Sequence, residues 1–77
     1  MTRYRDLLVE QEGMDVGSVV GCGLDRLQRD VTDYEIDTAV QFYKEHKEKI
    51  NSFPINARRQ AIHEFIEQGR IPSYIKT

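Results

Sequence analysis

A glycine-rich stretch, residues 17–23, comes nearest in this sequence to a phosphate-binding loop. It lacks both the lysine–serine/threonine ending of a Walker loop and the spacing of a dinucleotide-binding turn, and no strand pattern precedes it. Gly17 and Gly21 lie four residues apart and flank an apolar helical face. Glycines so placed would let another helix approach closely. The stretch therefore predicts helix packing, not phosphate binding.

The single cysteine and the two histidines are the next candidates for chemistry. A nucleophilic pair of Cys22 with His46 or His63 needs an orienting group and a cleft, which spacing alone does not provide. A Cys22-dependent enzyme remains one alternative. We expect instead that Cys22 is a partly buried apolar residue, that His46 belongs to the apolar face of a long helix, and that His63 is solvated.

Acidic residues are dense around Asp30, Asp33, Glu35 and Asp37. Their spacing does not match the twelve-residue calcium loop, which also requires a glycine at its turn. Asp33 and Glu35 fall in the first turn of a predicted helix, where the backbone dipole favours negative charge. Two histidines and one cysteine cannot complete a tetrahedral zinc site without carboxylates. No metal and no cofactor is predicted.

Two adjacent cations, Arg58 and Arg59, open the last long helix. The helix dipole disfavours positive charge there, and Arg58 falls in the middle of the apolar stripe. Something else must hold these side chains. The pair could form salt bridges with the acidic N-terminal half, or it could bind a phosphate or an acidic protein surface.

The 77 residues suit one small globular domain spanning 1–77, with 39% hydrophobic and 31% charged residues. The net charge of −2 argues against non-specific binding to phosphate backbones. Residues 1–37 carry nine acids and four bases, whereas residues 38–77 carry four acids and seven bases. The halves should attract each other, within one chain or head-to-tail between subunits, or present a basic face to an acidic partner.

Cysteine usage and hydropathy predict a cytoplasmic protein. A single cysteine cannot form an internal disulfide. No apolar run approaches the ~18 residues of a membrane span, and residues 1–6 lack the apolar core of a secretion signal.

Apolar residues recur at three- and four-residue spacing, which predicts an all-helical chain. A first helix spans about residues 3–12 and ends at Gly13. A second covers part of residues 16–31, with 24–30 as its secure part, because three glycines leave residues 14–23 open between helix and loop.

A capping box at Thr32-Asp33-Tyr34-Glu35 begins a long central helix over about residues 33–51. Its apolar positions spread over an arc of about 160°, too wide for one neighbouring helix. The arc predicts either two neighbours or one neighbour and a second subunit. These positions are Ile36, Ala39, Val40, Phe42, Tyr43, His46 and Ile50.

Pro54 breaks the chain, and Asn56 is the expected N-cap of a helix over 57–68. Gly69 ends this helix and Pro72 forbids its continuation. The short tail, residues 73–77, contains Tyr74 and Ile75, which should dock on the core or on a partner. Whether the tail is docked or free stays open.

The segment Ile62–Tyr74, which reads IHEFIEQGRIPSY, resembles the end of the recognition helix in excisionase-type, MerR-like winged-helix proteins. The resemblance covers about thirteen residues. It implies a DNA-binding transcriptional regulator that uses the 57–68 helix, with Arg58 and Arg59 at the DNA backbone or groove.

The sequence thus predicts an all-α bundle of three or four helices around the central 33–51 helix. The favoured function is a small non-enzymatic adaptor or regulator that binds another protein, itself or both, and we expect the chain to form a homo-oligomer. Nucleic acid is the less favoured partner, and no membrane or small-molecule substrate is predicted. Aromatic and arginine side chains dominate binding energy at interfaces, so the expected partner-binding residues are Phe42, Arg58, Arg59 and Tyr74.

Overall fold

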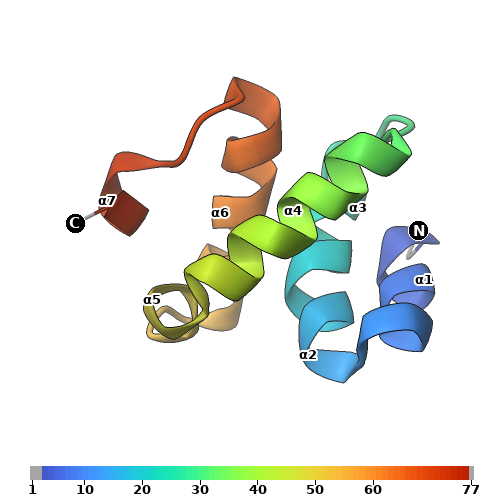
Figure 1. The fold of residues 1–77 in the computed structure, drawn as a ribbon, viewed down its shortest axis with the longest axis horizontal. Helices are drawn as coiled ribbons and strands as arrows, with labels where there is room; N and C mark the ends of the chain where they lie inside the picture. The colour runs from blue at the N-terminus through green and yellow to red at the C-terminus, as the bar shows by residue number, and fades with distance from the viewer. Residues whose placement is uncertain (1–2, 77) are drawn as a thin grey trace.

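The computed structural model describes residues 3–76, and every regular element within them is a helix. The predicted all-α fold is confirmed. Four helical arms pack into a body 30 × 23 × 19 Å in extent (Figure 1). The elements are α1 (Arg3–Glu12), α2 (Met14–Val16), the π-helical turn η1 (Gly17–Gly21), α3 (Cys22–Asp25), α4 (Asp33–Glu45), α5 (Lys47–Asn51), α6 (Ile55–Gln68) and α7 (Ser73–Lys76).

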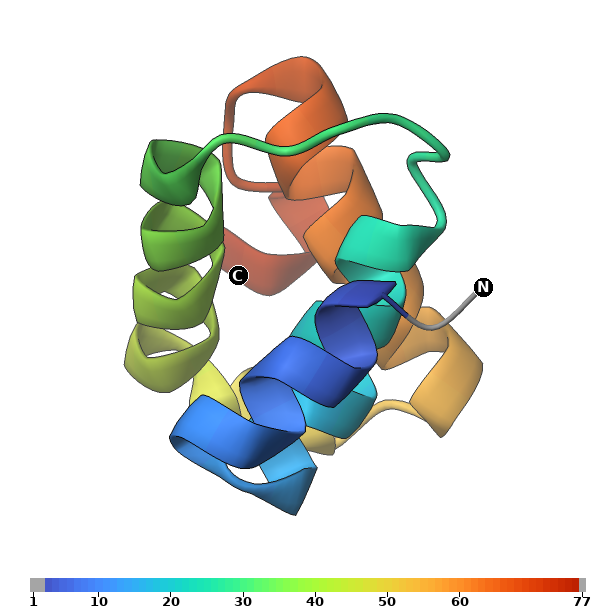
Figure 2. The same ribbon diagram turned by 90° about the vertical axis from the view of Figure 1, so that its right-hand side faces the viewer.

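The first two arms form a helical hairpin that turns at Gly13, whose φ of 103° favours glycine. The second arm comprises α2, η1 and α3 without a gap, and it lies beside α1 (Figure 2). Residues 14–23, left open by the sequence, are therefore helical. The prediction of helix over residues 24–30 is wrong beyond Asp25. The chain leaves the helix at Arg26, and Gln28 takes a left-handed φ of 56°.

Glycines allow the second arm to lie directly against its neighbours. A Cβ on Gly17 would stand 2.2 Å from Val9 Cγ2, and one on Gly21 would stand 2.4 Å from the Cα of Arg5. On another side, a Cβ on Gly23 would meet Ile62 Cβ of α6 at 2.6 Å. The predicted close helix packing at Gly17 and Gly21 is confirmed. Glycine has a low helix propensity, but any larger residue at these positions would overlap the neighbouring helix.

Asp25 at the end of α3 caps the start of α1. Its carboxylate accepts hydrogen bonds from the backbone amides of Tyr4 (2.7 Å) and Arg5 (3.2 Å). These amides belong to the unpaired donors of a helix N-terminus, where negative charge is also favoured by the dipole. The hairpin therefore closes through a polar contact between residues twenty-one positions apart.

The third arm begins at the predicted capping box of Thr32 and Glu35, which is present. It is not one helix over 33–51, because His46, with φ −116° and ψ 25°, separates α4 from α5. The helix resumes at once, since the amide of Ile50 donates to the carbonyl of His46 at 2.9 Å. His46 itself is half-buried, with its ring centroid 5.3 Å from that of Phe42.

The wide apolar arc of the third arm is covered by the chain itself. Packing against α6 and η1 buries its apolar residues, and none retains more than 8% of its surface: Ile36, Ala39, Val40, Phe42, Tyr43 and Ile50. Two neighbouring arms are enough to cover the arc, so the alternative in which a second subunit completes that cover is wrong.

The fourth arm is α6, which begins at Ile55 after Pro54, so Asn56 lies inside the helix and is not its N-cap. The side chain of Asn56 instead accepts a hydrogen bond from Arg26 at 3.1 Å. Gly69 ends α6 in the left-handed conformation, as predicted. Residues 73–76 of the tail are docked, because they form the short helix α7 and Ile75 is buried, while Thr77 lies outside the described residues.

Candidate functional site

The four predicted partner-binding residues do not form one site. Phe42 lies in the core, and Arg59 reaches the second arm. Arg58 and Tyr74 both contact Phe53, which the sequence analysis did not select. Two of the four predicted residues therefore lie together at the turn between α5 and α6, and not on the α4 face.

Phe42 is a core residue and presents no surface to a partner. Only 3% of its surface is exposed, and its ring stacks on that of Phe65 with centroids 4.2 Å apart. Its place at the edge of the arc suggested accessibility, but α6 covers that edge. The expectation that its side chain lies at a partner surface is therefore wrong.

Arg59 binds the π-helical turn. Its Nε donates to the carbonyl of Ser18 at 2.9 Å, and its guanidinium also donates to Ser18 Oγ at 3.3 Å. In the turn, the amide of Cys22 donates to the carbonyl of Gly17, five residues back, and not to that of Ser18, four residues back. Arg59 thus serves the carbonyl that an ordinary α-helical turn would have paired.

Replacing Arg59 with methionine should lower the free energy of unfolding by about 2 kcal/mol. The change keeps most of the apolar stem but leaves the Ser18 carbonyl without its charged donor. Urea denaturation of the variant measures the loss, with the exposed neighbour Gln60→Met as control. A loss in Arg59→Met no larger than in the control would show that the contact contributes nothing.

Arg58 holds the turn that follows α5. Its Nε donates to the carbonyl of Phe53 at 2.7 Å, and its NH2 group donates to the carbonyl of Asn51 at 2.8 Å. These carbonyls lie at the end of a helix, where a cation is favoured. The contact explains how an arginine is tolerated within the apolar stripe of α6.

Neither arginine forms an ion pair with the acidic N-terminal half. The four ion pairs within residues 3–76 are Arg3–Asp30, Arg5–Asp6, Arg29–Glu35 and Lys44–Glu12. Both Arg58 and Arg59 instead bind backbone carbonyls.

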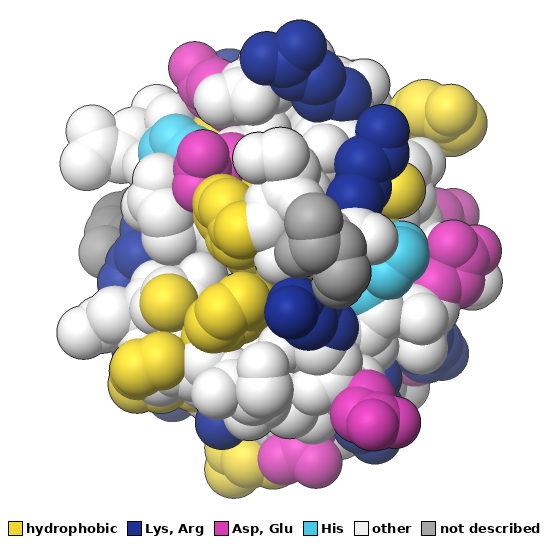
Figure 3. Space-filling model, turned by 90° about the vertical axis from the view of Figure 1, so that its left-hand side faces the viewer, with side chains coloured by type: hydrophobic (Ala, Val, Ile, Leu, Met, Phe, Trp, Pro, Cys, Tyr) yellow, Lys and Arg dark blue, Asp and Glu magenta, His cyan; other side chains and the backbone are white. Residues whose placement is uncertain are grey.

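An exposed apolar surface surrounds the turn that Arg58 holds. We name it the linker patch and define it as Phe53, Pro54, Ile55 and Tyr74. The ring of Tyr74 meets that of Phe53 edge-on at 5.9 Å, while Ile55 and Tyr74 each expose 38% of their surface. Figure 3 shows hydrophobic side chains gathered on this end of the molecule. The sequence signal for the patch was an aromatic and an isoleucine flanking Pro54.

Each aromatic ring of the linker patch has one charged neighbour, Lys49 for Phe53 and Glu64 for Tyr74. Lys49 Nζ lies 5.8 Å from the centroid of the Phe53 ring, within range of a cation–π contact. The Tyr74 hydroxyl donates to the carboxylate of Glu64. Partial burial and this hydrogen bond raise the pKa of Tyr74 to about 12. The phenol therefore keeps its proton to a higher pH than an ordinary tyrosine, and that proton is directed at Glu64.

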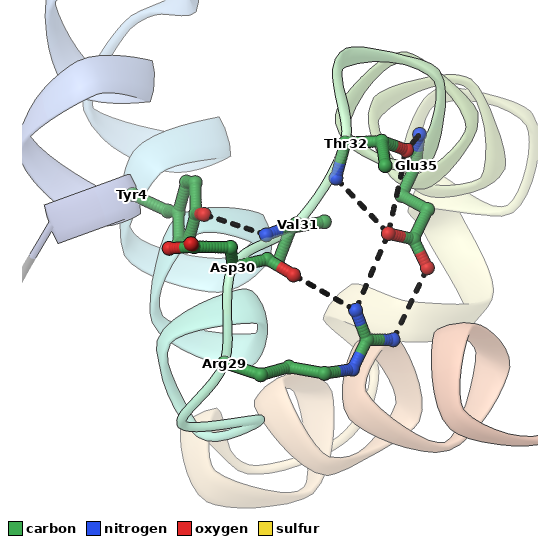
Figure 4. A network of polar contacts seen from close by, with 6 residues as sticks. All are labelled: Tyr4, Arg29, Asp30, Val31, Thr32 and Glu35. Carbon is green, nitrogen blue, oxygen red and sulfur yellow. Dashed lines mark hydrogen bonds and ion pairs between the residues drawn. The ribbon is translucent and has the colours of Figure 1, made fainter.

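A polar cluster surrounds the capping box at the N-terminal end of α4 (Figure 4). Thr32 and Glu35 cap each other's backbone amides at 3.0–3.1 Å, and Arg29 donates to both carboxylate oxygens of Glu35 at 3.3 and 3.1 Å. The hydrogen bonds from Arg29 and from the Thr32 amide lower the pKa of Glu35 to about 2. Nearby, the buried Tyr4 hydroxyl accepts from the amide of Val31 at 2.7 Å. The cluster fixes the segment that leads into α4.

Stability should fall on acidification partly because Glu35 becomes protonated. Its folded pKa of about 2 lies below the unfolded value of about 4.3. Its contribution is therefore complete above about pH 4.3 and is lost as the pH falls toward 2. Urea denaturation between pH 7 and 2 should give wild type a larger free energy of unfolding than Glu35→Gln above pH 5. The two free energies should converge near pH 2. A constant difference across this range would contradict the assignment.

The other residues considered for chemistry do not assemble. Cys22 is half-buried, and within residues 3–76 neither histidine has a hydrogen bond to it. His63 is half-buried, not solvated as expected, and its Nδ1 is enclosed without a hydrogen-bond partner. In the same part of the chain, no three His, Cys, Asp or Glu side chains lie close enough to hold a metal ion.

A cavity of about 590 Å³ beside the start of α1 has charged walls that largely bind one another. Arg3 pairs with Asp30, and Asp25 caps α1. Arg29, also in the wall, binds Glu35. Each of these charged side chains thus already has a structural partner.

Fold and surface together define a small all-α domain whose accessible chemistry is an aromatic and aliphatic patch. Comparison with known protein families, with curated proteins and with solved structures finds no match to this chain. None of the helices within residues 3–76 has both the length and the apolar character needed to cross a membrane. The linker patch is therefore the feature of this domain that best indicates a function.

Proposed function

We propose that this chain is a small non-enzymatic adaptor or regulatory protein of the cytoplasm that binds another protein through the linker patch. The observation that carries the proposal is the apolar surface at the turn before α6, where the Phe53 and Tyr74 rings meet and the neighbouring Ile55 is exposed. Tyrosine is enriched at the centres of interfaces, where an aromatic ring supplies apolar area together with one polar group. Tyr74 has both features.

The linker patch is also held in place before any partner arrives. Arg58 fixes the Phe53 carbonyl at 2.7 Å, and Pro54 limits the backbone of the turn. Ile75 and Pro72 are buried on either side of Tyr74, so α7 is packed onto the body. A surface already ordered in the free protein loses less conformational entropy when it binds. This order favours a recognition role.

An enzymatic role has less support, because the titratable side chains with strongly shifted pKa values have structural functions. Glu35 caps α4, and Tyr74 lies against Phe53. The hydroxyl beside Glu35 is that of Thr32, which donates to the Glu35 carboxylate at 3.3 Å and accepts from the Glu35 amide at 3.1 Å, so it belongs to the helix cap. The single cysteine agrees with a reducing compartment such as the cytoplasm.

Ile55→Glu tests the proposal with little risk to the fold. Ile55 is the first residue of α6, where the dipole favours a carboxylate, and its side chain is partly exposed. Immobilised wild-type chain should retain specific proteins from a cell extract, and Ile55→Glu should retain about tenfold less, measured by quantitative mass spectrometry. The control is Tyr34→Glu on α4, where 78% of the residue surface is exposed.

Two results would overturn the proposal. In the first, the wild-type chain retains no more protein than an empty support. In the second, Ile55→Glu and Tyr34→Glu retain the same proteins in the same amounts. Circular dichroism of both variants verifies that each remains folded.

A further inference from the structure

We infer that the partner of the linker patch is the acidic end of a second copy of this chain, so that copies bind head-to-tail. The inference rests on the proposed function, because it names the occupant of the same patch. It is carried by a second exposed apolar surface, by the opposite charge of the two ends, and by their positions in the fold.

The second surface lies where α1 turns into α2. Met14 exposes 67% of its surface there, beside a hollow of about 230 Å³. Val9 and Met14 form the apolar part of its wall, and Asp6 and Glu10 lie at its rim together with Arg5. We name this region the acidic end. An open apolar hollow of this size can receive one aliphatic or aromatic side chain from a neighbour.

The two surfaces carry opposite charge. Residues 3–16, which contain the acidic end, have four acidic and two basic side chains. Residues 47–76, which contain the linker patch, have six basic and three acidic side chains. Lys49 lies over Phe53 within the patch, and Lys76 follows Tyr74 by two residues. Facing charges of opposite sign favour docking of the acidic end onto the linker patch.

The same charges disfavour a symmetric dimer. In a two-fold contact centred on the linker patch, each patch would face the other, and Lys49 and Lys76 of one copy would approach the same cations of the other. Like charges brought together at an interface oppose association. A head-to-tail contact places the cations opposite Glu10 and its acidic neighbours instead.

The fold places these surfaces far apart. The hairpin of α1 and α2 lies at one end of the 30 Å axis, and α5 and α7 lie at the other (Figure 1). One copy can therefore engage two others at once, one at each end. Contacts of this kind build rings or open chains of copies, not closed dimers. Assembly should depend on concentration and weaken with salt.

Two charge-reversed variants test the inference on purified protein. Glu10→Lys/Asp15→Lys reverses the charge of the acidic end, because Glu10 lines its hollow and the exposed Asp15 follows Met14 directly. Lys49→Glu/Lys76→Glu reverses the cations beside the linker patch. Analytical ultracentrifugation should show wild type forming species larger than dimers as concentration rises, and about tenfold weaker association of each variant alone. An equimolar mixture of the two variants should recover association, because each then finds complementary ends on the other.

The controls separate charge from fold. Asp37→Lys, an exposed reversal on α4 outside both surfaces, should associate like wild type, and circular dichroism must show every variant folded. Raising the salt concentration to 1 M should weaken the wild-type assembly. Failure of the mixture to recover association, or a wild type that remains monomeric or stops at a dimer, overturns the inference.

These failures differ from failure of the proposed function. A purified chain that remains monomeric, while Ile55→Glu still abolishes capture of other proteins from extract, shows that the linker patch binds a different partner. An acidic peptide would then be the occupant. Loss of both results together would remove the role of the patch itself.

Discussion

Replacing Gly21 with alanine is expected to destabilise the protein by about 3 kcal/mol or more, although alanine is the better helix former. Helix propensity alone predicts a gain of up to about 1 kcal/mol at a helical glycine. The added methyl group would stand 2.4 Å from Arg5 Cα and 2.7 Å from Arg5 N. These are backbone atoms, so no side-chain rotation relieves the overlap and the α1 hairpin must separate.

Gly69→Ala is the matched control for this prediction. Gly69 has a left-handed φ of 70° and open space around its Cα, so alanine there meets only backbone strain of about 1 kcal/mol. Urea denaturation followed by circular dichroism compares the two variants. A Gly21→Ala protein as stable as wild type, or more stable, would show that the two helices of the hairpin do not approach as closely as the structure indicates.

The second large effect is expected at Phe42. Phe42→Ala should lower the free energy of unfolding by about 3–5 kcal/mol, the usual loss for a buried phenylalanine. The substitution removes a ring that stacks on Phe65 at 4.2 Å and leaves a cavity between α4 and α6. A domain of this size has a total stability of roughly 4–12 kcal/mol, so the substitution should remove about a quarter of that stability or more.

Tyr34→Ala on the same helix supplies the comparison for Phe42. Tyr34 exposes 78% of its surface, and its removal should change stability by less than about 0.5 kcal/mol. Thermal and urea unfolding of both variants measure the difference. If Phe42→Ala kept near wild-type stability and instead lost only partner binding, Phe42 would be a surface residue, as its place in the helical arc first suggested.

The two predictions have a common consequence for function. Both concern contacts that build the body of the domain, whereas Ile55, Tyr74 and the acidic end can be altered with the body intact. Variants at Gly21 and Phe42 should therefore lose binding only because they lose the fold. Measuring stability alongside binding separates these two classes of residue.

The sequence by itself determined the features whose causes lie within a few neighbouring residues. Thr32 and Glu35 form their capping box three residues apart, and Gly69 ends α6 because the helix needs a left-handed residue there. The spacing of Gly17 and Gly21 also predicted a close helix approach, which the structure contains. Periodicity, caps and breaks act locally, so the element types and most of their limits follow from the amino acids.

Only the tertiary structure decided which surfaces remain exposed and what holds the charged side chains. The wide apolar arc of the third arm left open whether a second helix of the same chain or a second subunit completes its cover, and the structure shows that α6 and η1 cover its apolar residues. Asp25 caps a helix twenty-one residues away, and Arg59 pairs with Ser18 forty-one residues away. Phe53 and Tyr74 meet because α7 folds back beside the turn. Burial and these partners depend on contacts between distant segments, and a local pattern of residue types does not specify which segments will meet.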